Sequence, residues 1–367
     1  GKDYVLIEGG TITVEAAGDG IKADNEDDAE LGAVQITDGT IDITAGDDGV
    51  QAATDVLVAG GTVTIDAGSV SGTGRAIQGD VMVHVSGGMI DATAIDDAIH
   101  SNESVTVDGG SITVAAGDDG IHGDLAVTVN GGSITVTEAF EGIEAEVITI
   151  NDGAIDITSR DDGLNVAGSE TEAATATTPA GGRGGRGGAE AVGEYYVYIN
   201  GGTTVITILG ELDEQGDGID ANGHVVMTDG VVVISGPTDT RNSAFDYSGG
   251  TFVMTGGTII GTNVDGRNSE GVGIGSSQAS LYITTGSTMA AGTVAHIENA
   301  DGETLVTFEP VNDYSVIVFS SPDLVDGQAY DVYLGGTITG DSATGMYEDS
   351  EYTIGEHAGT VIASVSA

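Results

Sequence analysis

The chain has 367 residues, enough for one long repetitive domain or for two domains of ordinary size. Its 59 acidic and eight basic residues give a formal net charge of −51, which excludes nucleic acid and anionic membrane surfaces as partners. No stretch approaches the ~20 consecutive apolar residues of a membrane-spanning helix, so no membrane span is predicted.

A short glycine-containing pair, Gly-Gly or Asp-Gly, recurs through the first half of the chain. Successive pairs are 21 to 27 residues apart, and the commonest step is 22 residues. A nearly fixed period of this length is typical of solenoid proteins. The pairs begin at Asp38, Gly60, Gly87, Gly109, Gly131 and Asp152.

The repeat at 109–130 shows how each unit is expected to fold. Apolar residues alternate with polar ones after the glycine pair, at Ile112 and Val114, and this period of two predicts a strand with those side chains inward. A second strand is centred on Ile121 and a third on 127–129. We therefore predict an all-β, right-handed parallel β-helix with three strands and about 22 residues per coil.

Two other folds were considered for this period. A leucine-rich repeat has a similar length, but it requires Leu-x-x-Leu-x-Leu and an asparagine ladder, and leucine is sparse in this chain. A β-sandwich also has short strands and glycine turns, but it has no reason to repeat its turn chemistry every 22 residues.

A carboxylate-Gly-Ile unit, or a close variant, follows each glycine pair at a nearly constant offset. The stacked units would form a column of acids, with an additional acid before it in several repeats and another oxygen ligand five residues after it. The predicted metal ligands from these three positions are Asp19, Asp24, Asp47, Asp48, Asp96, Asp97, Asp118, Asp119, Asp124, Glu141, Glu146, Asp161, Asp162 and Asp217.

Calcium is the cofactor that this column predicts. Carboxylates stacked at the strand spacing of about 4.8 Å repel by roughly 1 kcal/mol per pair in water, so a cation between coils is favourable. Calcium takes six to eight oxygen ligands, whereas magnesium demands a tight octahedron, and zinc would require His or Cys, neither of which is arranged for it. Simple Asp-Gly turns with glycine at positive φ, or the solvated surface of a salt-loving organism, would also place acids here, but they explain the doubled acids less well.

A second column of polar residues is expected to point outward beside the acids: Lys22, Gln51, Gln78, His100, His122, Glu144, Asn165 and Asp220. The adjacent His100 and His122 could form a metal or catalytic pair, but we favour exposed polar residues beside carboxylates. Arg75 takes the place of the acid in the third repeat. We predict that it replaces a metal ion by bridging Asp48 and Asp97.

The repeat is interrupted at 167–193 by a Ser/Thr/Ala/Gly-rich stretch that is typical of a flexible insertion. Less regular repeats follow, and past residue 300 longer apolar segments predict a small β unit that covers the C-terminal end of the solenoid. The predicted organisation is therefore a β-helix at 1–299, with the insertion at 167–193, and a C-terminal β unit at 300–367.

Aromatic residues are concentrated in the second half, since only Tyr4 and Phe140 precede residue 195. A flat aromatic platform for sugar rings can therefore exist only there, and Tyr195, Tyr196 and Tyr198 are the candidates. The alternative is that these three side chains pack beneath the insertion.

The chain resembles secreted bacterial carbohydrate-binding domains with a calcium-binding parallel β-helix, which include cellulose-binding members and are structurally akin to pectate lyases. The resemblance lies in coils with Gly-Gly-x-Ile-x-Val and Asp-Asp-Gly-Ile, together with the tail at 319–330. It covers most of the chain except the insertion. It implies calcium at the Asp-Asp-Gly positions, affinity for a polysaccharide such as cellulose or another cell-wall glycan, and a location outside the cell or on its surface.

Three functions follow from these observations as hypotheses. The first is a calcium-stabilised extracellular β-solenoid that binds polysaccharide or mediates cell-surface adhesion. The second is a structural subunit that assembles end to end into a filament, because both terminal segments, 4–7 and 360–365, are apolar strands with edges to pair. The third is a polysaccharide lyase of the pectate type, which would need a cationic base near the acids, and only Lys22 and Arg75 lie there.

Overall fold

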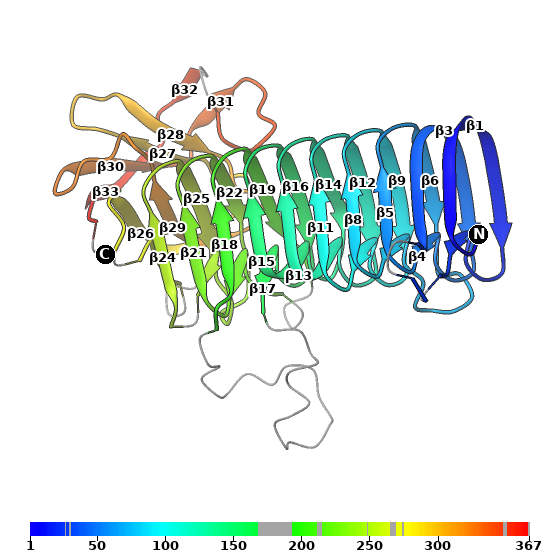
Figure 1. The fold of residues 1–367 in the computed structure, drawn as a ribbon. Coiled ribbons are helices and arrows are strands. Elements are labelled where there is room, and N and C mark those ends of the chain that lie inside the picture. Colours follow the sequence, from blue (N-terminus) through cyan, green and yellow to red (C-terminus); the bar gives the residue numbers. More distant parts are fainter. Residues whose placement is uncertain are drawn as a thin grey trace.

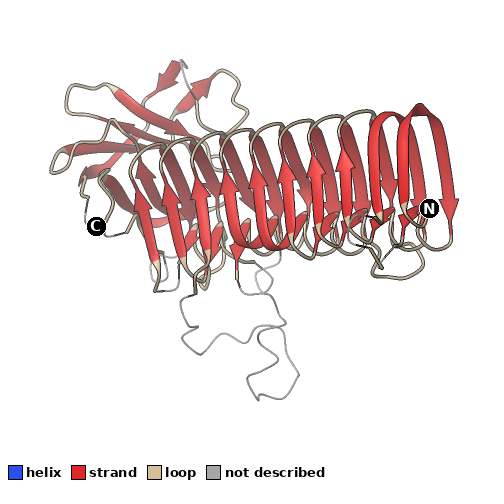
Figure 2. Ribbon diagram, viewed as in Figure 1, coloured by secondary structure: helices blue, strands red, loops and turns tan. Residues whose placement is uncertain are grey.

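A computed structural model describes residues 1–25, 27–28, 31–167, 193–210, 215–247, 249–264, 269–273, 275–347 and 351–365. All regular elements of this described part are β-strands (Figure 2). It therefore offers no helix that could cross a membrane. The predicted insertion at 167–193 lies outside the described residues, apart from its first and last residues.

Three columns of parallel strands run along the molecule, because each strand pairs with the equivalent strand of the next repeat (Figure 1). The first column contains the strand that follows each glycine pair, and its long members β1 and β3 also begin the third column. Its strands are β1 (Tyr4–Ala16), β3 (Ala33–Ala45), β6 (Thr62–Asp66), β9 (Met89–Ala94), β12 (Ser111–Ala116), β14 (Ser133–Glu138), β16 (Ala154–Ser159), β19 (Thr203–Ile208), β22 (Val231–Ser235) and β25 (Thr258–Asn263).

The second and third columns follow the acidic turn of each repeat. The second consists of β2 (Ile21–Ala23), β4 (Val50–Ala52), β7 (Ile77–Gly79), β10 (Ile99–Ser101), the first parts of β13 (Ile121–Val129) and β15 (Ile143–Ile150), β17 (Leu164–Val166), β20 (Ile219–Ala221) and β23 (Phe245–Asp246). The third consists of β5 (Asp55–Val58), β8 (Met82–Val85), β11 (Ser104–Val107), the second parts of β13 and β15, β18 (Tyr196–Ile199), β21 (His224–Met227) and β24 (Thr251–Met254).

The core is a stack of aliphatic side chains between the columns. Ile112 pairs with Ile90 in the preceding repeat and with Ile134 in the next, and all three are about 1% exposed. Burying an isoleucine side chain contributes about 1.5–3 kcal/mol, so each repeat gains most of its stability by covering its neighbour. The period-two alternation read from the sequence is therefore the alternation of core and surface.

The second glycine of each pair makes the turn into the first column. Gly110 has φ of +92°, where a side chain is strained, and a Cβ there would lie 3.0 Å from the carbonyl carbon of Gly87 in the preceding repeat. Both the left-handed backbone and the close stacking of turns require glycine at this position. This explains why the pair recurs at the period of the repeat.

A side-chain ladder that we did not predict joins the same turns. Asn130 Nδ2 donates to Asp108 Oδ1 at 2.8 Å, Asn151 Nδ2 to Asn130 Oδ1 at 2.7 Å, and Asn200 Nδ2 to Asn151 Oδ1 at 3.0 Å. These residues immediately precede the glycine turns. An asparagine ladder is thus present without the leucine pattern that we had expected to accompany one.

At the C-terminal end the parallel order stops. Strand β29 (Tyr314–Ser320) pairs antiparallel with β25 and with β26 (Ser280–Met289). A separate four-stranded sheet contains β28 (Thr304–Phe308), β27 (Ala295–Glu298), β30 (Ala329–Leu334) and β33 (Glu356–Ile362), and a two-stranded sheet contains β31 (Thr337–Thr339) and β32 (Glu351–Thr353). Segments from both sides of residue 300 are therefore interleaved in the first two of these arrangements.

This arrangement corrects our placement of the C-terminal strand. Half of the segment 360–365 that we expected at an open end of the solenoid lies in β33, which pairs with β30 in the four-stranded sheet. The last parallel strand of the first column, β25, is paired on its outer side with β29. A filament that continued the parallel stack at this end would first have to displace β29.

Candidate functional site

The acidic column lies where the chain turns from the first to the second column of strands. Asp97 and Asp119 stand two residues before Ile99 and Ile121, which begin β10 and β13. The intervening Gly120 is not in the positive-φ region, but a Cβ there would lie 2.6 Å from the carbonyl oxygen of Gly142. Close stacking, rather than the positive-φ turn of the alternative interpretation, therefore explains this glycine.

Asp97 uses its two oxygens differently, and other ladder aspartates make one or the other of the same two contacts. One oxygen accepts a backbone N–H from the next repeat: Arg75 N donates to Asp48 Oδ1 at 2.9 Å, and Asp119 N donates to Asp97 Oδ1 at 3.2 Å. Asp162 accepts in the same way from the backbone of Asp217. The carboxylates thus contribute to the stacking of repeats even without a bound ion.

The second oxygen faces the side chain three residues further along, in the column of polar residues. Lys22 Nζ lies 2.7 Å from Asp19 Oδ2, and His100 Nδ1 lies 2.7 Å from Asp97 Oδ2. In these repeats, the acid of the column is therefore paired with the polar side chain three residues after it. The residue at that third position determines whether the acid is neutralised by the protein itself.

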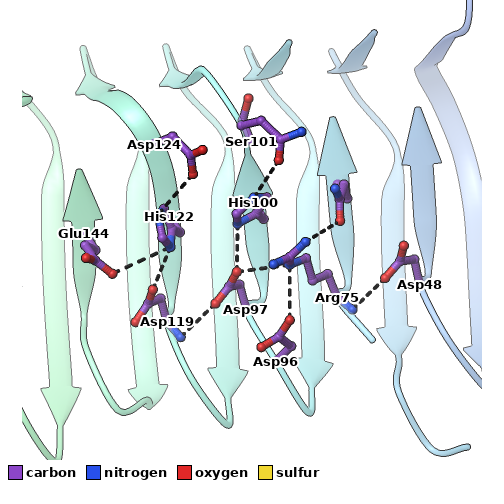
Figure 3. A network of polar contacts seen from close by, with 12 residues as sticks. Asp48, Arg75, Asp96, Asp97, His100, Ser101, Asp119, His122, Asp124 and Glu144 are labelled. Atoms are coloured by element: carbon purple, nitrogen blue, oxygen red, sulfur yellow. Dashed lines mark hydrogen bonds and ion pairs between the residues drawn. The ribbon is translucent and has the colours of Figure 1, made fainter. Parts of the chain in front are cut away.

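The structure corrects our expectation of exposure for part of the polar column. His100 is only 5% exposed, and Gln78 and Asn165 are also buried. The reason is that each of these side chains is flanked by its equivalents in the neighbouring repeats, since His100 pairs in register with Gln78 and His122. The rings of His100 and His122 have centroids 4.9 Å apart (Figure 3).

Arg75 bridges neighbouring repeats, but only in part as predicted. Its Nε lies 3.1 Å from Asp97 Oδ2 and 3.3 Å from Asp96 Oδ2. Asp48, in contrast, accepts from the backbone N–H of Arg75 and not from its guanidinium group. Because the guanidinium group also donates to Gln78 Oε1 at 2.8 Å, Arg75 is held in a structural network rather than presented as a base for a lyase reaction.

Basic side chains line the N-terminal repeats of the acidic column. Lys22, Arg75, His100 and His122 serve the repeats from Asp19 to Asp119. From Glu141 onward the third position is itself acidic or an amide, at Glu144, Asn165 and Asp220. Among the described residues, no Lys or Arg forms an ion pair with Glu141 or Asp162.

The pKa shifts differ among the acids of the column. Burial would raise the pKa of Asp97, but the hydrogen bond with His100 and the nearby charges hold it below its usual value. Burial and then the charges of Asp220 and Asp217 raise the pKa of Asp162 well above its usual value. Burial and the charge of Glu144 do the same for Glu141, and burial with the charge of Asp119 raises the pKa of Glu144 to about 8.

The structure brings together some of the predicted metal ligands. Asp96, Asp97 and Asp118 converge, as do Glu141, Asp161 and Asp162, and Asp217 lies with Asp162 and Asp220; the candidate ligand atoms within each group are within 4.8 Å of one another. Asp119 converges with His122 and Glu144, and Asp97 also converges with His100 and His122. Within the described chain, the predicted ligands that join no such group are Asp19, Asp24, Asp47, Asp48, Asp124 and Glu146.

Four members of these groups were not among our predicted ligands: His100, His122, Glu144 and Asp220. All four belong to the polar column that we had assigned to the solvent. The signal that could have identified them is their constant spacing of three residues from the ladder acid. This spacing brings the ladder acid and the polar side chain together, although the strand of the second column begins between them in the sequence.

The three candidate tyrosines separate into two environments. Tyr196 and Tyr198 point to the same side of β18, and their rings are stacked with centroids 5.2 Å apart and planes 3° apart. The ring of His224, in the next repeat, lies 5.1 Å from that of Tyr196. Tyr195 instead packs against the hydrophobic core, so only Tyr196 and Tyr198 form a surface platform.

Comparisons with known proteins gave one finding. A family model described as "Carbohydrate-binding domain-containing protein" matches residues 1–120, about a third of the chain. The matched segment includes Arg75, Asp97 and His100, but it ends before the paired tyrosines. Searches of curated proteins and of solved structures gave no match.

Proposed function

We propose that this protein is an extracellular, calcium-stabilised β-solenoid that binds polysaccharide. The observation that carries the proposal is the match of residues 1–120 to a carbohydrate-binding family, on a chain whose repeats form long parallel sheets. A polymer binds such a surface through many weak contacts, each repeated at the spacing of the coils. Adhesion to a glycan-covered cell surface would use the same contacts.

The finer description of the fold belongs to this proposal. We infer that the three columns wind as a right-handed parallel β-helix, because crossovers between parallel strands are right-handed in about 98% of cases. The in-register pairing of equivalent residues, such as Ile99 with Ile77 and Ile121, supports a regular winding. In a β-helix of this kind, equivalent surface residues of successive coils lie at a constant spacing along the molecule.

Calcium is proposed for the part of the acidic column that begins at Glu141. Glu141, Asp161 and Asp162 bring three carboxylates together, and Asn165 Nδ2 donates to Glu141 Oε2 at 2.7 Å. Asn165 is 8% exposed, and its buried Oδ1 finds no hydrogen-bond partner in the described part of the chain. An oxygen-binding cation would satisfy this oxygen and the crowded carboxylates together.

The sugar-binding surface is proposed to include Tyr196 and Tyr198. Their parallel rings stand beside Thr149 and Val147 of the preceding repeat, so the platform continues onto a flat strand surface. Aromatic rings contribute about 0.5–1.5 kcal/mol per stacked pair, which is useful only when several contacts add along a polymer. The polar column within the matched segment is the other surface on which a glycan could lie.

Retention on insoluble polysaccharide tests the proposal. The wild-type chain in calcium is expected to be retained on cellulose or a related cell-wall glycan, and the Tyr196→Ala/Tyr198→Ala variant is expected to lose most of that retention. Tyr4→Ala is the matched control, because Tyr4 is 46% exposed and lies inside the segment matched to the family. Loss with the control but not with the pair would move the site to the N-terminal repeats. No retention of the wild type on any tested glycan would reject the function.

A further inference from the structure

One part of the acidic column differs from the rest because a histidine lies between its carboxylates. His122 Nδ1 is 2.8 Å from Asp119 Oδ2 and 3.6 Å from Glu144 Oε2. On the other side of the ring, His122 Nε2 is 3.4 Å from Asp124 Oδ1 (Figure 3). Each nitrogen of this imidazole therefore faces carboxylate oxygen.

Counting hydrogen-bond donors shows that this arrangement is one positive charge short. A neutral imidazole carries one N–H, whereas ionised carboxylates only accept. If Nε2–H points to Asp124, the lone pair of Nδ1 faces the oxygens of both Asp119 and Glu144. A positive charge has to lie between these three atoms, and it is a second proton on the ring, a proton on one of the two carboxyl groups, or a metal ion.

The neighbouring histidine does not present the same requirement. His100 Nδ1 also faces a carboxylate, at 2.7 Å from Asp97 Oδ2, but Arg75 Nε lies 3.1 Å from that same oxygen. The guanidinium group already supplies a fixed positive charge there, and it would repel a metal ion. Within the described residues, no Lys or Arg pairs with Asp119 or Glu144.

We propose that Asp119, His122 and Glu144 bind a divalent first-row transition-metal ion of the zinc class. The three candidate ligand atoms lie within 4.8 Å of one another and need only small movements to converge on one ion. An imidazole nitrogen suits zinc, copper, iron or nickel, whereas calcium takes oxygen ligands. This proposal does not depend on polysaccharide binding or on the calcium sites.

The surroundings of the three ligands fit such an ion. A metal-binding histidine usually donates its other N–H to a carboxylate or carbonyl, which orients the ring, and Asp124 occupies that position. Asp119 is anchored in the wall of the solenoid and is 4% exposed, while the side chains of His122 and Glu144 remain 22% and 25% exposed. The site is therefore rigid on one side and open to ions and water on the other.

The stack also explains why a transition metal would be held at this repeat and not at others. In the register of the sheet, His122 pairs with His100 on one side and with Glu144 on the other. It is thus the residue at which the column changes from basic to acidic partners. Only there does an imidazole nitrogen meet two carboxylates that lack a Lys or Arg partner in the described chain.

Zinc titration of the full chain tests the proposal. The metal-free protein is titrated with Zn²⁺ by calorimetry in excess Ca²⁺, which fills any oxygen-only sites. Wild type is expected to bind one ion with histidine nitrogen at about 2.0–2.1 Å in X-ray absorption spectra, and His122→Gln is expected to lose that ion. Asp124→Asn is expected to weaken binding by about 10–100-fold because it removes the orienting carboxylate.

The matched control is His84→Gln, because His84 also pairs with an aspartate, Asp108, at 2.8 Å but has no second carboxylate beside it among the described contacts. This control is expected to bind zinc like the wild type. Zinc binding by a folded His122→Gln protein equal to that of the wild type, or no zinc binding by the wild type in excess Ca²⁺, would overturn the proposal. If His122→Gln does not fold, as judged by circular dichroism, Glu144→Gln is measured in its place with the same two outcomes.

Discussion

At the scale of single residues, the carboxylates of the acidic column repel one another, and the chain supplies only a few positive groups to offset this repulsion. Arg75 is the clearest example, since it stands where other repeats have an acid and pairs with two acids of the following repeat, Asp96 and Asp97. Asp97 is 3% exposed, so its charge is not stabilised by water. Removing the arginine would leave a buried carboxylate without its fixed counter-charge.

Arg75→Gln is accordingly expected to destabilise the protein by about 3 kcal/mol, the usual cost of removing one partner of a buried ion pair. Lys2→Gln is the control, because the pair of Lys2 with Asp27 is largely exposed and is expected to contribute less than about 0.5 kcal/mol. Urea unfolding of both variants in the same buffer measures the difference. Equal, small effects would show that Arg75 is only a surface charge.

At the scale of the strand and turn, the repeat is defined as much by its glycines as by its apolar residues. Gly110 combines a positive φ with a backbone contact to the preceding repeat, so an added methyl group would disturb both. Gly286 has a φ of +77° but no atom within 4 Å of a potential Cβ. The two positions therefore separate the cost of the backbone conformation from the cost of stacking.

Gly110→Ala is expected to destabilise the protein by more than Gly286→Ala, with about 1 kcal/mol of each effect arising from the left-handed conformation. The excess at Gly110 measures the stacking term. Thermal unfolding of the two variants gives the comparison. If their melting temperatures fell equally, stacking would not be the reason why the pair recurs.

At the scale of the whole molecule, the parts that could be predicted from sequence are those that repeat. The buried positions Ile112 and Val114 were identified from alternation within one unit, because stacking makes neighbouring units equivalent. The burial of His100 could not be predicted in this way, since it depends on the side chains above and below. The antiparallel pairing of β29 with β25 also escaped prediction, because a single crossing of the chain leaves no period in the sequence.

The crowded acids also predict how the stability of the metal-free molecule depends on pH. The folded-state pKa of Glu144 is about 8, well above the ordinary value of 4.5 that applies to the unfolded chain. Between these values the folded state binds the extra proton, so stability is greatest below about pH 4.5 and declines as pH rises toward 8. Urea midpoints of the chelated protein are expected to fall across this range. Glu144→Gln, which cannot ionise, is expected to flatten the decline, and an unchanged slope would assign it to other groups.

Calcium binding is expected to offset the repulsion between the carboxylates of the acidic column. Asp162 offers a test, because its substitution is expected to change stability in opposite directions with and without calcium. Asp162→Asn keeps the oxygen that accepts from the backbone of Asp217 but removes a charge from among Glu141, Asp161, Asp217 and Asp220. In chelator, the variant is therefore expected to melt above the wild type, because it relieves repulsion.

In calcium the order is expected to invert, because a site filled at a hundredfold excess over Kd adds about 2.7 kcal/mol to the wild type and little to the variant. The exposed Asp229→Asn, at a glycine turn away from the column, is the control and is expected to show no inversion. Raising the concentration of a monovalent salt separates binding from screening, since screening stabilises the wild type without calcium but cannot make it more stable than Asp162→Asn. A variant that stays above the wild type in both chelator and calcium would leave the acids as a merely repulsive surface, and the calcium proposal would then fail.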